Sequence, residues 1–186
     1  YIYDIKGGAR IFIDNVREPS GCDTAIINAE AGRTGPVGEL RARNVYGDTT
    51  ALRMVDSGDT VARTSIEHVR AGATNPAVIG EGALRQISIC DVWGRGATAA
   101  RISSTNNGYP ESVSLTDCRT EGSGVSAVEL TDLSGGSQLE PFSIQIINPS
   151  AGNNETVADL QYAKSCSVKA TGNFGTGTQK ITVGSG

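Results

Sequence analysis

The residues best suited to acid–base chemistry share one sequence context. Asp91 and Asp117 each come one residue before an apolar residue or cysteine in a strand-like segment, and His68, the only histidine, has the same place in an earlier segment. If these segments stack as successive turns, the two carboxylates lie roughly 5 Å apart, near the spacing of strands in a sheet. Such a pair suits a retaining glycosidase. Glu67 and Glu121 are further acidic candidates for catalysis.

The same place in each segment also suits a structural role. Along the chain it is occupied by Asn15, Asn44, His68, Asp91, Asp117, Ile146 and Ala170. Short Asn and Asp side chains hydrogen-bond to nearby backbone and favour bends. We therefore predict a stacked column of corner residues. The catalytic interpretation stays open beside it, and for His68 it would require a carboxylate or a substrate within hydrogen-bond reach.

A second set of residues, rich in arginine and aromatic side chains, lies two residues after the Asn, Asp or His position of each segment. It consists of Arg17, Tyr46, Arg70, Trp93 and Arg119, followed by Asn148 and Gly172. Each follows the position expected to be buried, so these side chains should point outward. Arginine pairs with the carboxylates of acidic sugars, and aromatic rings stack on sugar faces. The pattern therefore predicts a ridge that binds a glycan, with a subunit contact or a self-stacked ladder of side chains as alternatives.

A repeat must position these columns. The segment beginning at Ile11 has counterparts beginning at Leu40, Thr64, Ile87, Val113, Phe142 and Cys166. Apolar residues recur at the first and third places of most copies, which is the alternation of a strand with one buried face. The mean period is about 26 residues over about seven copies, too long for hexapeptide repeats and too short for propeller blades.

A second short strand follows each copy after a turn rich in Gly, Asn, Asp and Ser, as in Thr98–Ile102 and Ser126–Leu130. A strand, a turn, a second strand and a loop make one coil of a solenoid. We therefore predict an all-β, right-handed, single-stranded parallel β-helix of about seven coils. Its third-place residues Ile13, Ile66, Ile89, Leu115, Ile144 and Val168 should stack inside as one column.

The composition fits one domain with a true core. The chain has 186 residues, of which 38% are hydrophobic and 19% charged, and its net charge of −4 gives no basic footprint for nucleic acid. No apolar run of about 18 residues is present, so membrane insertion is not expected. We expect residues 1–186 to form a single β-helix domain that is part of a longer or oligomeric protein.

The cysteines Cys22, Cys90, Cys118 and Cys166 include no C-x-x-C pair. Their spacing therefore predicts neither a zinc site nor a disulfide framework. Cys118 and Cys166 occupy columns that are otherwise apolar, and we expect both to be buried and unpaired. Neither a metal nor a cofactor is expected.

On this repeat, from about Ile11 to Val183, the chain resembles the pectate-lyase-like superfamily of right-handed β-helices. It is most similar to the β-helix shafts of bacteriophage tailspikes and appendages. The resemblance concerns the fold, and many activities share that fold. The Asn-Thr-Asp, Asp-Asp and Gly-His-Gly motifs of polygalacturonase-like members are absent.

The missing motifs favour a non-catalytic module over an enzyme. The expected function is structural support and receptor binding in a tailspike-type virion protein, at the virion surface or in the extracellular space. A bacterial surface polysaccharide is the expected partner, together with a homotrimer or other virion proteins. The alternatives are a polysaccharide lyase or glycoside hydrolase, and a bacterial surface adhesin.

Overall fold

The computed structural model describes most of the chain. The described residues are 2–18, 25–31, 35–56, 61–82, 84–103, 111–122, 124–131, 142–151, 156–160, 166–171 and 180–183. Every regular element within them is a β-strand. No helix in this part of the chain is long and apolar enough to cross a membrane.

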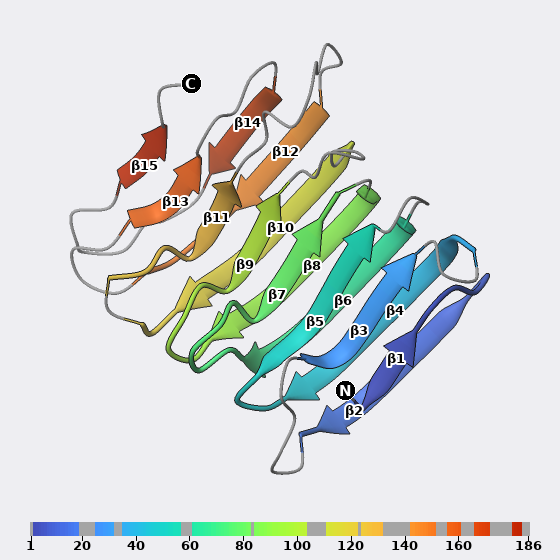
Figure 1. Cartoon of the computed structure of the whole chain (residues 1–186). Helices are drawn as coiled ribbons and strands as arrows, with labels where there is room; N and C mark the ends of the chain where they lie inside the picture. Colours follow the sequence, from blue (N-terminus) through green and yellow to red (C-terminus); the bar gives the residue numbers. More distant parts are fainter. Residues whose placement is uncertain are drawn as a thin grey trace.

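The strands form two parallel sheets that face one another (Figure 1). The seven-stranded sheet contains β2 (Ile11–Arg17), β4 (Val37–Tyr46), β6 (Val61–Ala71), β8 (Leu84–Gly94), β10 (Ser112–Thr120), β12 (Phe142–Ile147) and β14 (Cys166–Thr171). The eight-stranded sheet contains β1 (Tyr3–Ile5), β3 (Ala25–Ala31), β5 (Thr50–Asp56), β7 (Val78–Glu81), β9 (Ala100–Ser103), β11 (Val128–Thr131), β13 (Thr156–Leu160) and β15 (Lys180–Val183). The chain alternates between the sheets, so that each strand pairs with the strand two places later.

This alternation defines a parallel β-solenoid with a period near 25 residues. The fold class and the repeat length predicted from the sequence are therefore confirmed at this level. The elements follow one another from one end of the stack to the other, as the colours in Figure 1 show.

The predicted count of about seven coils is wrong, because the structure supports about four turns. A copy of the sequence motif predicts one strand, whereas a turn also requires the second strand and the connections that close the circuit. Between Val37 and Thr131 both strands of each turn are described, together with most of the corner between them. Outside that range the strands still pair in parallel, with a shift of register between β13 and β15, but much of what joins them lies outside the described residues.

The core consists of stacked apolar columns inside the solenoid. Ile13 pairs with Ala42, Ala42 with Ile66, Ile66 with Ile89, and Ile89 with Leu115, and all five are buried. Alternation places every second side chain of these strands inside. This part of the predicted interior column is confirmed.

The predicted continuation of that column through Ile144 and Val168 is wrong. Leu115 pairs with Ile146, while Ile144 pairs with Val113 and with Val168. The sequence alignment was therefore displaced by two residues at β12. A shift of two residues keeps each side chain on the same face of the sheet, so the apolar pattern alone could not reveal it.

In six strands of the seven-stranded sheet, from β2 to β12, the chain bends within the strand or directly after it at a residue with left-handed backbone geometry. These residues, called here the αL column, are Asn15, Asn44, His68, Asp91, Asp117 and Asn148, with φ between 49° and 55°. Non-glycine residues rarely adopt this region, and Asn and Asp do so most readily. The predicted column of corner residues is confirmed from Asn15 to Asp117 but is wrong for Ile146 and Ala170, because Asn148 takes the place assigned to Ile146 and Ala170 pairs with Ile146.

Backbone contacts between turns constrain the corner that follows the bend. A Cβ atom on Gly94 would collide with the carbonyl oxygen of Ala97, and one on Gly96 with the carbonyl oxygen of Ala73 in the preceding turn. Gly96 N also donates to Gly72 O at 3.0 Å. Glycine is required at Gly96 because the main chains of successive corners pack directly on one another, and at Gly94 because the corner folds back against its own backbone.

Candidate functional site

The arginine–aromatic ridge is the set Arg17, Tyr46, Arg70, Trp93 and Arg119. The strand register aligns these five residues one above another across β2, β4, β6, β8 and β10. The three arginines and Tyr46 are exposed, and Trp93 is half-buried. The predicted column is therefore present, while the next residue along it is Ser150, which bridges to Arg119, and not Asn148.

The side chains of the ridge stack on one another. The guanidinium carbon of Arg70 lies 4.1 Å from the centre of the Trp93 ring, and that of Arg119 lies 4.5 Å from it. Arg17 lies 5.6 Å from the ring centre of Tyr46. These distances are typical of cation–π contacts. Because Arg70 and Arg119 come from the strands on either side of Trp93, the indole is enclosed between two guanidinium groups.

This enclosure changes which groups of the ridge can contact a ligand. The sequence suggested that aromatic rings would stack on sugars, but the ring of Trp93 already packs against arginine. A stacked guanidinium keeps its N–H donors at its edge, where they remain directed to solvent. The ridge therefore presents arginine donors held in place by aromatic rings.

The αL column runs beside the ridge and is linked to it. Nδ1 of His68 lies 2.9 Å from Oδ2 of Asp91, and Nη2 of Arg119 lies 3.4 Å from Oδ1 of the same carboxylate. All three side chains are partly exposed, between 39% and 57%. His68 thus has the carboxylate partner, Asp91, that the catalytic interpretation required.

Two shallow depressions flank this cluster. One, of about 200 Å³, is lined by the ridge residues from Tyr46 to Arg119 together with His68 and Asp91. The other, of about 310 Å³, is lined by Asp91, Asp117, Arg119, Asn148 and Ser150. The site is therefore an open surface and not a closed pocket.

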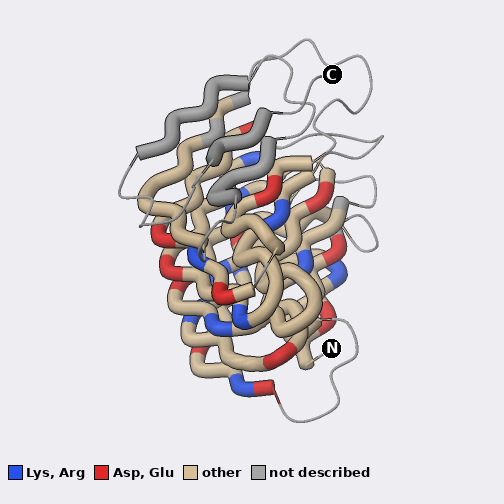
Figure 2. The backbone as a smooth tube through the Cα atoms, turned by 90° about the vertical axis from the view of Figure 1, so that its left-hand side faces the viewer, with Lys and Arg blue, Asp and Glu red and all other residues tan. Residues whose placement is uncertain are grey.

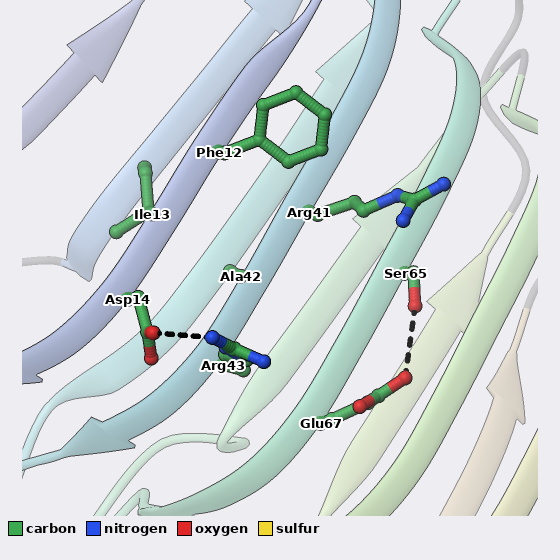
Figure 3. Close-up of a pocket in the computed structure, with 8 residues that line it drawn as sticks. All are labelled: Phe12, Ile13, Asp14, Arg41, Ala42, Arg43, Ser65 and Glu67. Atoms are coloured by element: carbon green, nitrogen blue, oxygen red, sulfur yellow. Dashed lines mark hydrogen bonds and ion pairs between the residues drawn. The ribbon is translucent and has the colours of Figure 1, made fainter.

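The four acidic candidates for catalysis are only partly brought together. Asp91 and Asp117 line one depression, whereas Glu67 lines another on the outer face of the seven-stranded sheet (Figure 3). Glu121 follows β10 at the corner, where its backbone N–H donates to Gly94 O at 3.0 Å. Both oxygens of Asp91 contact neighbouring side chains, Oδ2 with His68 and Oδ1 with Arg119.

The thiol pKa values of Cys90 and Cys118 are both raised. Burial raises the pKa of the Cys90 thiol, and the negative charges of Asp117, Glu67 and Asp91 raise it further. Burial raises the pKa of Cys118 much more strongly. Cys118 is buried and unpaired as predicted, and Cys90 is also unpaired. Cys22 lies outside the described residues, as does the side chain of Cys166.

Sequence reasoning missed Asn148 and Ser150 as members of the two columns. The segment Asp117-Cys118-Arg119 aligns with Asn148-Pro149-Ser150. The Asn before a buried residue was the signal that could have found them, since Asn favours bends. The apolar residues of β12 offered two equivalent alignments, and the polar residue would have distinguished them.

The fold and the site define a parallel β-solenoid protein with an arginine-rich outer ridge. No protein-family model matches the chain, no curated protein matches it, and no solved structure matches it.

Proposed function

We propose that this chain is a non-catalytic structural module that binds an acidic polysaccharide through the arginine–aromatic ridge. We further propose that it is a right-handed β-helix of the type found in tailspike and appendage shafts of bacteriophages. Its receptor would be a bacterial surface polysaccharide, and its place the virion surface or the extracellular space. A bacterial surface adhesin would use the same ridge in the same way.

The observation that carries the proposal is the enclosure of Trp93 between Arg70 and Arg119. A free arginine side chain loses rotamer entropy when it binds a ligand. Stacking on a ring reduces this loss, because the guanidinium is already oriented before the ligand arrives. An oriented guanidinium is well suited to bidentate pairing with a carboxylate.

The spacing of the arginines also suits a polymer. Arg70 and Arg119 lie two strands apart, on the two sides of Trp93, which corresponds to about 10 Å at the usual strand spacing. Arg17 continues the row on the far side of Tyr46. An extended glycan with acidic groups at intervals could therefore contact several arginines at once, and linked contacts strengthen binding.

The proposed handedness rests on a general rule. A connection between parallel strands of one sheet is right-handed in about 98% of cases, because strand twist favours that direction. In this chain every strand of a sheet joins the next strand of that sheet through such a crossover.

Binding to alginate, an acidic polysaccharide, tests the proposal. Arg70→Ala and Arg119→Ala should each weaken binding by about 1–3 kcal/mol and reduce its salt dependence. Arg101→Ala is the matched control, because Arg101 lies on the other sheet, paired with Glu129 at 2.6 Å. The unmodified protein and the three variants are compared on alginate, hyaluronan and polygalacturonate. Equal binding of all four proteins to these polysaccharides would rule the ridge out as the glycan site.

A specific observation favours a second function, polysaccharide cleavage. His68 and Asp91 form a hydrogen-bonded pair at 2.9 Å, and a histidine oriented by a carboxylate can act as a general base. Release of reducing ends from acidic polysaccharides would reveal this activity. Activity that disappears in His68→Gln but persists in Arg70→Ala would favour the enzyme over the binding module.

The ridge could instead contact a second copy of the chain in a homotrimer. Exposed tyrosine, tryptophan and arginine are enriched at protein interfaces. Sedimentation of Trp93→Ala distinguishes this alternative, because loss of an interface anchor shifts an oligomer toward monomer, whereas loss of a glycan site does not.

A further inference from the structure

A second concave surface lies on the outer face of the seven-stranded sheet, before the αL bend. One part, of about 460 Å³, extends over β2, β4 and β6 and is shown in Figure 3. The other part, of about 520 Å³, extends over β4, β6, β8 and β10. Both are lined by Arg41 and Ser65, so they form one continuous depression, here called the serine groove.

The floor of the groove is a row of small hydroxyl side chains. Ser65 pairs with Ser88, and Ser88 pairs with Ser114, so the three stand on successive strands along the solenoid axis. Gln86 and Ser112 form a parallel row beside them. Strands favour Thr, Val and aromatic residues at such positions. Serine is not among these favoured residues, and each of its hydroxyls can both donate and accept a hydrogen bond, so the row is suited to a polar ligand.

One end of the groove carries an exposed aromatic ring. Phe12 is 63% exposed and lies on β2, the edge strand of its sheet. The guanidinium of Arg41 lies 5.5 Å from the centre of the ring, and Figure 3 shows the two side chains standing beside one another. An aromatic ring at this exposure is a platform on which the apolar face of a sugar can pack.

Charges along the groove are balanced by ion pairs that are shorter than the 3.4 Å contact of Arg119 with Asp91 in the ridge. Arg41 pairs with Glu39 at 2.8 Å, and Arg43 pairs with Asp14 at 2.8 Å. Arg63 donates to Gln86 at 3.3 Å. Acidic and basic residues also stand close together along much of the solenoid in Figure 2. A groove whose arginines already have partners offers little attraction to an acidic ligand and suits an uncharged one.

We propose that the serine groove binds an uncharged glycan chain that lies along the solenoid axis. The ring of Phe12 packs against one sugar, and the serine and glutamine side chains hydrogen-bond to the hydroxyl groups of the following sugars. From β2 to β10 the groove crosses five strands, about 19 Å at the usual strand spacing. This site is separate from the ridge and does not depend on the ridge binding an acidic glycan.

Affinity electrophoresis in gels containing dextran, mannan or galactomannan tests the inference. The chain should be retarded by at least one of these uncharged polysaccharides, to the same extent at low and high salt. Phe12→Ala should weaken this binding about tenfold, equivalent to about 1.4 kcal/mol, and Phe12→Tyr should retain it. Ser88→Lys, which places a long side chain in the row of serines, should weaken it similarly.

Two controls separate this site from the ridge. Ser103→Lys makes the same change on the outer face of the other sheet and should leave binding unchanged. Arg70→Ala should leave binding to the uncharged polysaccharides unchanged even where it weakens binding to alginate. Absence of retardation by all three polysaccharides, or retardation unaffected in both Phe12→Ala and Ser88→Lys, would overturn the inference. Loss of alginate binding alone would bear only on the ridge.

Discussion

His68 and Asp91 stand one turn apart in the αL column, with imidazole Nδ1 2.9 Å from carboxylate Oδ2. The second carboxylate oxygen of Asp91 lies 3.4 Å from Nη2 of Arg119 in the ridge. The Asp91 side chain therefore connects a corner residue of the preceding turn to a ridge arginine of the following turn. It also offsets part of the positive charge that the ridge presents.

Asp91→Asn should tighten binding of the protein to alginate. The substitution removes a negative charge beside Arg119, so the net positive charge of the ridge increases. The salt dependence of binding should become steeper at the same time. Binding isotherms at several salt concentrations measure both effects. Weaker binding together with lost release of reducing ends would instead favour polysaccharide cleavage.

Asp117→Val should destabilise the fold by about 1–2 kcal/mol. Asp117 has φ of 52°, and a β-branched residue is strained in this region of backbone space. Asp117→Asn should have little effect on stability, because Asn adopts left-handed geometry readily. Urea denaturation of the two variants gives the comparison, and equal stability of both would show that the bend does not constrain residue type.

The free energy of unfolding should fall as the pH rises above about 8.5, the ordinary pKa of cysteine in an unfolded chain. Burial raises the pKa of the Cys118 thiol in the folded protein. The unfolded state therefore loses a proton that the folded state keeps, and the stabilisation present at lower pH is lost at a rate of up to about 1.4 kcal/mol per pH unit.

Cys118→Val is the matched control for this pH dependence. Cys118 pairs with Val92, in a column that includes Val16, Val45 and Val69, so valine suits the site. The variant should show a shallower decline of stability between neutral and alkaline pH. Identical slopes for the two proteins would contradict the prediction.

Gly94→Ala should cost about 1–3 kcal/mol, the usual range for added atoms in a packed region. The new Cβ would collide with the backbone carbonyl of Ala97, which the corner holds in place. Gly80→Ala should cost less stability. The Cβ atom added at Gly80 would lie 2.8 Å from the end of the Leu84 side chain and 3.0 Å from the end of the Ile102 side chain. Side-chain ends can move, whereas corner backbone cannot. Thermal denaturation that ranks the two variants in the opposite order would refute this account.

The sequence contained enough information for the interior columns from Ile13 to Leu115, because alternation of apolar residues in each copy determines which face is buried. The sequence contained less information about β12. Ile144 and Ile146 are both apolar and lie two residues apart, so either could be aligned with Leu115. The chemistry of the bend resolves this ambiguity, since Asn148 belongs with the other αL residues. The number of turns could not be predicted from strand-like segments alone.

For the site, the sequence predicted which residues share a column but not how their side chains meet. The column of Arg17 to Arg119 follows from the repeat. The enclosure of Trp93 depends on side-chain rotamers, which spacing does not determine. The serine groove was missed because each serine, taken singly, is an ordinary outward-facing strand residue.

The bend at positive φ recurs in six strands, which makes the turns interchangeable at the level of the backbone. Duplication or deletion of a whole turn preserves every stacked position, whereas one extra residue before the bend would move the side chains of that strand to opposite faces. Change in length is therefore tolerated in the connections or in whole turns. A gene of this kind can grow by copying its own segments, so its length can evolve separately from the surface that each turn displays.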